Sequence, residues 1–121
     1  INDGQKKYIF QKTDLMIMPT LDESKKNSIE GFGISYLEAA FFAIPSIASN
    51  IGGTAEAVLN NSTGIVLEKN ELLHDIILDL LENKDKRITL GNAAQKRAIK
   101  YFQWERIIES HLSIYRKYNI I

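Results

Sequence analysis

A glycine-rich helix start, Glu30-Gly31-Phe32-Gly33-Ile34-Ser35-Tyr36-Leu37-Glu38, lies between two short apolar runs. The first run, Leu15–Met18, is stopped by Pro19, and its unbroken apolar character predicts a strand buried on both faces of a parallel sheet. Helical spacing continues from Ile34 to Phe42, and Ser46–Ser49 forms the second run. This order of strand, loop, helix and strand is typical of a parallel α/β unit.

A second unit of the same kind follows directly. The turn Asn50–Gly53 leads into a short helix, predicted over Thr54–Leu59 with Thr54 as its N-cap. Beyond the next turn, Asn60–Gly64, the run Ile65–Leu67 predicts a third strand. Further helices are predicted over residues 5–12, with Tyr8 and Ile9 facing inward, and over residues 71–83, 85–101 and 104–118. We therefore expect an α/β fold that consists of a small parallel sheet with flanking helices.

Two of the late helices are amphipathic. In the helix over residues 71–83, one face carries Leu72, Leu73, Ile76, Ile77, Leu80 and Leu81. In the last helix, one stripe carries Ile107, Ile108, Leu112 and Tyr115. An open sheet edge and an apolar stripe of this kind predict self-association or cover by another domain.

Composition excludes several classes of protein. The chain has 121 residues, with 15 Lys plus Arg and 15 Asp plus Glu, so its net charge is zero and a nucleic-acid partner is not expected. It has no cysteine, so disulfide scaffolds and thiolate metal sites are excluded. No apolar run approaches the ~18 residues that span a bilayer, and we expect a cytoplasmic protein. Because the sequence begins at Ile1, without an initiator Met, we expect residues 1–121 to be one partial domain of a longer protein.

Three glutamates accompany the glycines on the two successive units. Glu30 precedes Gly31, Glu38 lies eight residues further on, and Glu56 follows the pair Gly52-Gly53. Glycines let a ligand approach the backbone, and the amide groups at a helix N-terminus suit a diphosphate. Carboxylates accept paired hydrogen bonds, which suits the vicinal hydroxyls of a sugar. Each glutamate alone is better interpreted as a solvated helix-end residue, but the repeated pattern on two successive units favours a binding site.

The same segments resemble a known family. Glu30-Gly31-Phe32-Gly33-Ile34-Ser35-Tyr36-Leu37-Glu38-Ala39 resembles the E-x7-E motif of the group 1 (family 4) glycosyltransferases, which have the GT-B fold. Gly52-Gly53-Thr54-Ala55-Glu56 resembles their G-G-x-x-E segment, and Tyr101-Phe102-Gln103-Trp104 resembles the aromatic start of their last helix. The resemblance covers nearly the whole chain and implies a Rossmann-like half of the C-terminal, donor-binding domain.

The resemblance implies a retaining transferase that uses a nucleotide-sugar, with a UDP- or GDP-linked donor, no cofactor and no metal. It implies a catalytic Glu30 beside the donor sugar and a Glu38 that binds the ribose. The other implied donor-binding residues are Gly31, Phe32, Gly33, Ile34, Gly53 and Glu56. Backbone groups of residues 31–33 would contact sugar hydroxyls, and the following amides would hold the diphosphate by electrostatic stabilisation. The product would belong to cell-surface glycan or glycolipid synthesis.

The sequence also departs from the family. The Lys/Arg pair that grips the phosphates and the N-terminal acceptor domain both lie upstream in the family and are missing here, so we expect this chain alone to be inactive. Ala43 stands where the family often has glycine at a left-handed helix end, a change that costs on the order of 1 kcal/mol. The expected partners are a nucleotide-sugar, that N-terminal domain and a second copy of the chain.

Other interpretations remain open at this point. A degenerate relative would bind a nucleotide or a protein without catalysis. A glycoside hydrolase would use Glu30 and Glu38 as carboxylates separated by roughly 5–10 Å. The two histidines, His74 and His111, are expected at the surface. Positive residues of the late helices fit either a solvated face or a peripheral contact with an anionic membrane; they are Lys84, Lys86, Arg87, Lys96, Arg97 and Lys100.

Overall fold

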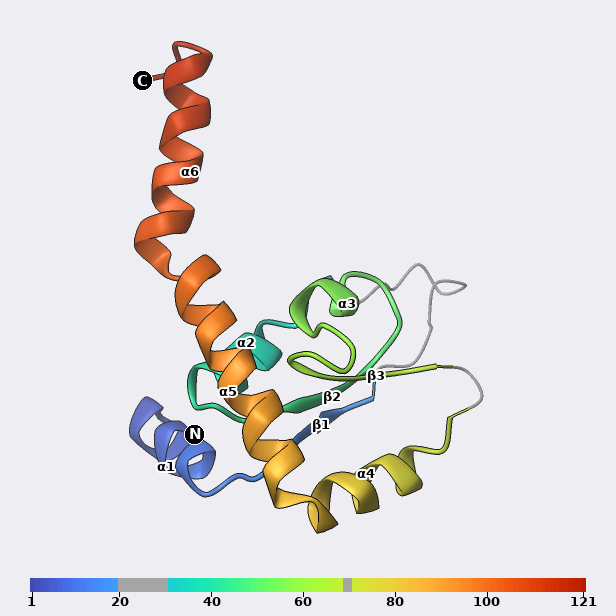
Figure 1. Ribbon diagram of the computed structural model, residues 1–121. Helices are drawn as coiled ribbons and strands as arrows, with labels where there is room; N and C mark the ends of the chain where they lie inside the picture. The colour runs from blue at the N-terminus through green and yellow to red at the C-terminus, as the bar shows by residue number, and fades with distance from the viewer. Residues whose placement is uncertain (20–30, 69–70) are drawn as a thin grey trace.

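A computed structural model describes residues 1–19, 31–68 and 71–121 of the chain (Figure 1). Three short strands alternate with helices, and three longer helices follow. The elements are α1 (Asp3–Gln11), β1 (Met16–Met18), α2 (Ile34–Phe41), β2 (Ser46–Ser49), α3 (Thr54–Ala57), β3 (Gly64–Leu67), α4 (Leu73–Glu82), α5 (Lys84–Tyr101) and α6 (Trp104–Lys117). The predicted loop over residues 20–28 and Glu30 lie outside the described residues.

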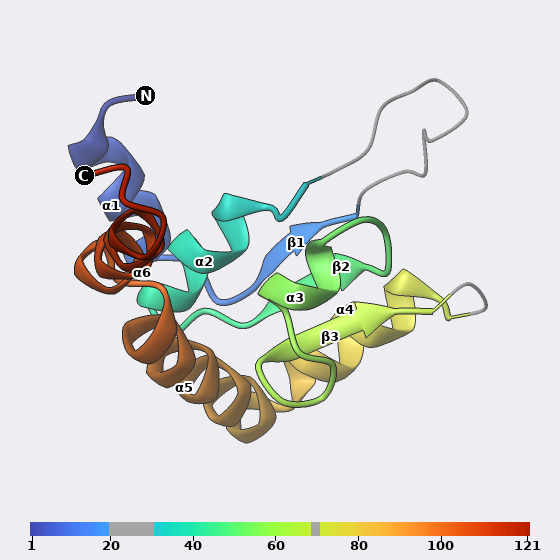
Figure 2. The same ribbon diagram turned by 90° about the horizontal axis from the view of Figure 1, so that it is seen from above.

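The strands form a parallel sheet in the order β1-β2-β3, which confirms the predicted α/β class. Ile47 pairs with Ile17 on one side and with Ile65 on the other. Helices α2 and α3 cover one face of the sheet, where Tyr36 and Ala48 belong to one buried cluster. Helix α4 and the start of α5 cover the opposite face, where Ile47 packs in a cluster with Leu80 and Leu90 (Figure 2).

Burial of the first two elements differs from the expectation. Ile17 is 38% exposed, so β1 is not buried on both faces, because it forms the edge of the described sheet. Tyr8 and Ile9 are 63% and 51% exposed, so their predicted inward orientation is wrong. Helix α1 instead contacts the body of the protein through Lys6 and Phe10, which lie one turn apart; the Phe10 ring stacks on Phe42 at 5.2 Å.

Helix α3 is shorter than predicted, and its N-cap is Gly53 rather than Thr54. The buried Thr54 hydroxyl contacts the carbonyls of Ser49 and Ile51, the latter at 2.8 Å. It therefore bonds backward to the turn instead of capping a helix. Val58 has an extended backbone, which ends α3 after one turn.

The end of α2 and the middle of α5 lie in close contact. Ala40 packs against Ala94 and Ala98, small residues that let the two helices approach. A Cβ atom added at Gly91 would lie 2.0 Å from the carbonyl oxygen of Ala43. Ala43 itself has φ = 57°, which confirms the predicted left-handed helix end.

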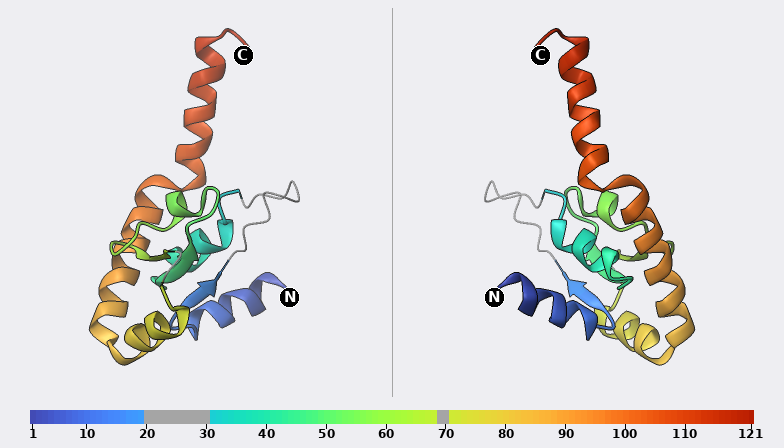
Figure 3. Two further views of the ribbon diagram at one scale, coloured as in Figure 1. Left: turned by 90° about the vertical axis from the view of Figure 1, so that its right-hand side faces the viewer. Right: turned by 90° about the vertical axis from the view of Figure 1, so that its left-hand side faces the viewer.

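Helix α6 extends away from the sheet and its covering helices (Figures 1 and 3). It contains no buried residue, and Trp104, Ile108 and Tyr115 are 74%, 52% and 41% exposed. The apolar stripe predicted on this helix is therefore accessible in the described chain. On α4 the predicted apolar face is narrower than expected, because Leu72 and Leu81 are exposed. Both histidines are exposed, as predicted.

Candidate functional site

The two glycine segments predicted on successive units lie in direct contact. The Gly53 N–H donates a hydrogen bond of 2.7 Å to the Gly31 carbonyl. Gly31 lies just before α2, and Gly53 lies between β2 and α3. Both segments follow the carboxyl ends of parallel strands, the edge at which open α/β sheets bind ligands.

Packing requires two of these glycines but not the third. Gly33 is the N-cap of α2 with φ = 76°, and a Cβ atom there would lie 2.6 Å from the Tyr36 ring. A Cβ atom on Gly53 would lie 2.2 Å from the Gly31 oxygen. At Gly31, by contrast, an added Cβ atom would meet no described atom within 4 Å. Internal packing therefore explains Gly33 and Gly53, whereas no described residue fills the space beside Gly31.

The N-terminus of α2 is held next to the end of β1. The Tyr36 hydroxyl donates to the Met18 carbonyl at 2.7 Å, and the Tyr36 N–H donates to the Gly33 carbonyl at 3.0 Å. Within the described part of the chain, the N–H groups of Ile34 and Ser35 have no hydrogen-bond acceptor, and the Ile34 side chain is 71% exposed. Such free amides, with the positive end of the helix dipole, favour an anion at this position.

Glu38 lies just over one turn further along α2 and faces α1. Its Oε1 atom forms an ion pair with the Lys6 ammonium group, and both side chains are partly exposed. The two residues line a hollow together with Phe10, Phe41 and Phe42. This ion pair occupies one carboxylate oxygen and leaves the lone pairs of the second for another donor.

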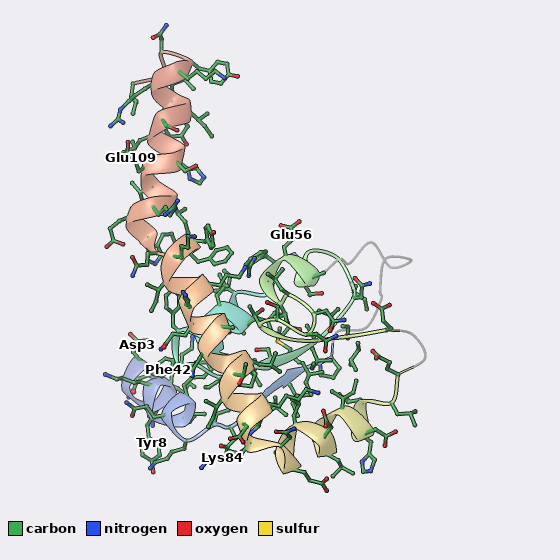
Figure 4. The ribbon with its side chains drawn as sticks, viewed as in Figure 1. Asp3, Tyr8, Phe42, Glu56, Lys84 and Glu109 are labelled. Carbon is green, nitrogen blue, oxygen red and sulfur yellow. The ribbon has the colours of Figure 1, made fainter. Side chains whose placement is uncertain are left out.

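Glu56 is an exposed residue of α3, and its side chain points away from the sheet (Figure 4). Its carboxylate has no partner among the residues that the structure describes. Its backbone carbonyl accepts a hydrogen bond of 2.7 Å from the Arg97 guanidinium. Glu56 therefore shares an edge of the fold with Gly53 but is not in contact with Glu38. The predicted catalytic residue, Glu30, lies outside the described residues.

Arg97 and Phe102 are residues that the sequence analysis did not single out for this site. Arg97 also donates a hydrogen bond of 3.0 Å to the Ala57 carbonyl, and its guanidinium carbon lies 4.9 Å from the centre of the Phe102 ring. The Phe102 ring packs against Phe32 with centroids 5.6 Å apart. Burial lowers the pKa of Arg97 from its ordinary value. One signal was available, because Arg97 lies seven positions after Leu90 and three after Ala94, a helical spacing that places it beside the buried face of α5.

Comparison with known proteins identifies the family. The family profile described as "Glycosyl transferases group 1" matches residues 1–97. The chain belongs to the group 1 glycosyl transferases. This assignment confirms the resemblance that the two glycine segments and their glutamates indicated.

Individual relatives of this glycosyl transferase chain share its sequence or its fold. The GDP-mannose-dependent alpha-(1-6)-phosphatidylinositol monomannoside mannosyltransferase of Mycobacterium tuberculosis is 31% identical over 94 residues, which are 76% of this chain and 24% of that protein. Sucrose-phosphate synthase from Thermosynechococcus elongatus has the same fold, with a TM-score of 0.84 and 24% identity over 99% of this chain and 29% of its own. Anabaena HepE, solved in complex with UDP and glucose, matches 93% of this chain and 29% of its own, with a TM-score of 0.73 and 23% identity.

The chain thus spans about a quarter of the length of the relatives that it matches. Its fold corresponds to part of the C-terminal domain of a GT-B glycosyl transferase, as the resemblance implied. Over the described residues, no helix combines the length and the apolar character that crossing a membrane requires.

Proposed function

We propose that this chain is the donor-binding portion of a retaining glycosyl transferase, which moves a sugar from a nucleoside-diphosphate sugar to an acceptor. The acceptor-binding N-terminal domain would belong to the same longer protein, and the product would be a cell-surface glycan or glycolipid. One observation carries the proposal: the Gly53–Gly31 hydrogen bond joins the two glycine segments beside the free amides of α2. Membership in the family supports it.

The diphosphate is assigned to the N-terminus of α2. The N–H groups of Ile34 and Ser35, which have no acceptor among the described residues, supply donors, and the left-handed Gly33 is the N-cap, so both lie in the first turn of α2. No described side chain lies beside Gly31, so among these residues none would keep a phosphate or sugar from its backbone. These fixed dipoles would stabilise the charge that develops on the leaving diphosphate.

Glu38 is assigned to the ribose hydroxyls and Glu30 to the donor sugar at the reacting centre. Lys6 occupies only one oxygen of the Glu38 carboxylate, so the second oxygen can accept a hydroxyl group. The UDP in the HepE complex and the GDP-mannose dependence of the mycobacterial enzyme support a UDP- or GDP-linked donor. Gly53 and Glu56 would border the same donor on the α3 side.

The test is a ligand-observed NMR titration of this chain with UDP, GDP, ADP and their sugar conjugates. Glu38→Gln should weaken binding of the preferred nucleotide about tenfold or more, because it removes a hydrogen bond to a charged acceptor. Glu82→Gln is the matched control, because Glu82 is exposed at the far end of α4 and should leave affinity unchanged.

The enzyme completed with its N-terminal domain tests the catalytic assignment. Glu30→Gln should abolish sugar transfer while nucleotide binding persists. The donor site is refuted if neither the chain nor the complete enzyme binds any of these nucleotides although both are folded. That result would favour a non-catalytic, protein-binding relative.

A further inference from the structure

Arg97 makes three contacts of two different kinds from one guanidinium group. Its two terminal nitrogens donate to the carbonyls of Glu56 and Ala57 at 2.7 and 3.0 Å, and its flat face lies on the Phe102 ring at 4.9 Å. The carbonyls belong to the last turn of α3, which carries its partial negative charge there. The Phe102 ring lies where α5 ends and α6 follows.

Phe102 extends the connection to the glycine segment. Its ring packs on Phe32, the residue between Gly31 and Gly33. On the other side of the site, Gly31 accepts a hydrogen bond from Gly53, which caps α3. The contacts therefore close a ring: Gly31 to Gly53, along α3 to Arg97, from Arg97 to Phe102, and from Phe102 back to Phe32.

We propose that Arg97 is a positioning residue of the donor site, which fixes the glycine segment 31–33 relative to α3 through Phe102. This inference rests on the proposed function for its ligand but on the described contacts for its geometry. Only arginine fits the position, because it combines two parallel N–H donors with a planar face; a lysine would keep the charge but could not stack and donate twice.

The expected role follows from the tolerance of a binding site to small displacements. The backbone groups of residues 31–33 can serve a diphosphate only while they keep their place beside the start of α2. A displacement of about 1 Å in a positioned group is enough to weaken function strongly. Arg97 acts on this segment through α3 and Phe102, since its two terminal nitrogens donate to the carbonyls of α3.

Arg87 provides a matched control on the same helix. Its guanidinium donates to the Leu80 and Leu81 carbonyls at 2.7 and 2.6 Å, so it caps the end of α4 as Arg97 caps α3. These contacts lie on the face of the sheet opposite to α2 and α3. Arg87→Lys therefore removes the same kind of interaction without touching the ring of contacts around the glycine segment.

The experiment compares Arg97→Lys, Arg87→Lys and the unmodified chain by three measurements: the urea midpoint, the amide NMR shifts of Gly31, Gly33 and Gly53, and the nucleotide titration. Both variants should lower the midpoint. Only Arg97→Lys should move the three glycine amides and weaken nucleotide affinity, by about tenfold for the loss of one charged hydrogen bond. Phe102→Leu removes the ring but keeps an apolar side chain, so it should change the NMR shifts of the same amides. It replaces Arg97→Lys in the test if that variant does not fold.

Unchanged glycine amides in Arg97→Lys and Phe102→Leu would overturn the inference, as would equal effects of the two arginine variants on affinity. The NMR shifts of the glycine amides are measured without any ligand, so they test the positioning role independently of nucleotide binding. If the unmodified chain binds no nucleotide while these amides still move only in the Arg97 and Phe102 variants, the proposed function fails and the positioning geometry stands.

Discussion

Gly53→Ala tests whether the contact between the two glycine segments holds the site together. The backbone of Gly53 has φ = −88° and ψ = 7°, a conformation that alanine also adopts. The substitution therefore introduces no dihedral strain, and its effect comes from the new methyl group. That group would lie 2.2 Å from the Gly31 oxygen and 3.2 Å from the Gly31 carbonyl carbon. Both are backbone atoms, which cannot rotate away as a flexible side chain would.

The magnitude follows from three contributions. Overpacking against fixed atoms costs about 1–3 kcal/mol. Separation of the segments also removes the 2.7 Å hydrogen bond from Gly53 to Gly31, which contributes about 1 kcal/mol. The lower chain entropy of unfolded alanine offsets about 0.4–1 kcal/mol of this loss. We expect a net decrease of about 1–3.5 kcal/mol in the free energy of unfolding.

Gly31→Ala is the matched control, and we expect it to lower nucleotide affinity while leaving stability nearly unchanged. An added Cβ atom at Gly31 meets no described atom, so stability should change by no more than about 0.5 kcal/mol. Nucleotide affinity should nevertheless fall, because the methyl group would fill the space assigned to the donor. Urea denaturation measures the first property and the NMR titration the second. The reasoning is refuted if Gly53→Ala unfolds at the same urea concentration as the unmodified chain, or if Gly31→Ala is the more destabilising of the two.

Two further substitutions test the frame around the site by chemical denaturation. Ala43→Gly should raise the free energy of unfolding by up to about 1 kcal/mol, because it relieves the left-handed strain at φ = 57° while it increases the entropy of the unfolded chain; a lower urea midpoint would contradict this. Thr54→Val keeps the shape of a fully buried side chain but leaves the Ser49 and Ile51 carbonyls without the hydroxyl, so it should cost about 1–3 kcal/mol, and an unchanged midpoint would show that the hydroxyl contributes nothing.

Local pattern was sufficient to predict the class and order of the elements. Parallel strands and their connecting helices leave a periodic signal in the sequence, and the three strands lie within two residues of their predicted bounds. The pattern did not show where a strand lies in its sheet. An apolar run such as Leu15–Met18 has the same composition at the edge as at the centre, and the exposure of Ile17 depends on the neighbours of β1. The inward orientation predicted for Tyr8 and Ile9 was wrong for the same reason, because burial on a helix also depends on which elements lie beside it.

The long-range contacts that charged side chains make could not be predicted. Lys6 and Glu38 are 32 positions apart, and Arg97 reaches carbonyls 40 and 41 positions before it. A sequence of balanced charge gives no indication of which lysine or arginine will leave the solvated surface. Only the helical position of Arg97, next to Ala94 and Ala98, distinguishes it from Lys96 and Lys100, which are exposed.

The glycines of the site do not all bear on function with equal weight. Gly33 is required by its left-handed φ and by the Tyr36 ring, and Gly53 by the Gly31 carbonyl, so a non-binding protein with this fold would need both. Gly31 has no such internal requirement, since a side chain there would meet no atom of the described residues. Of the three glycines, Gly31 is therefore the one whose identity a ligand at this edge would best explain. A stable Gly31→Ala chain that binds nucleotide as well as the unmodified chain would show that the donor does not need the space beside Gly31.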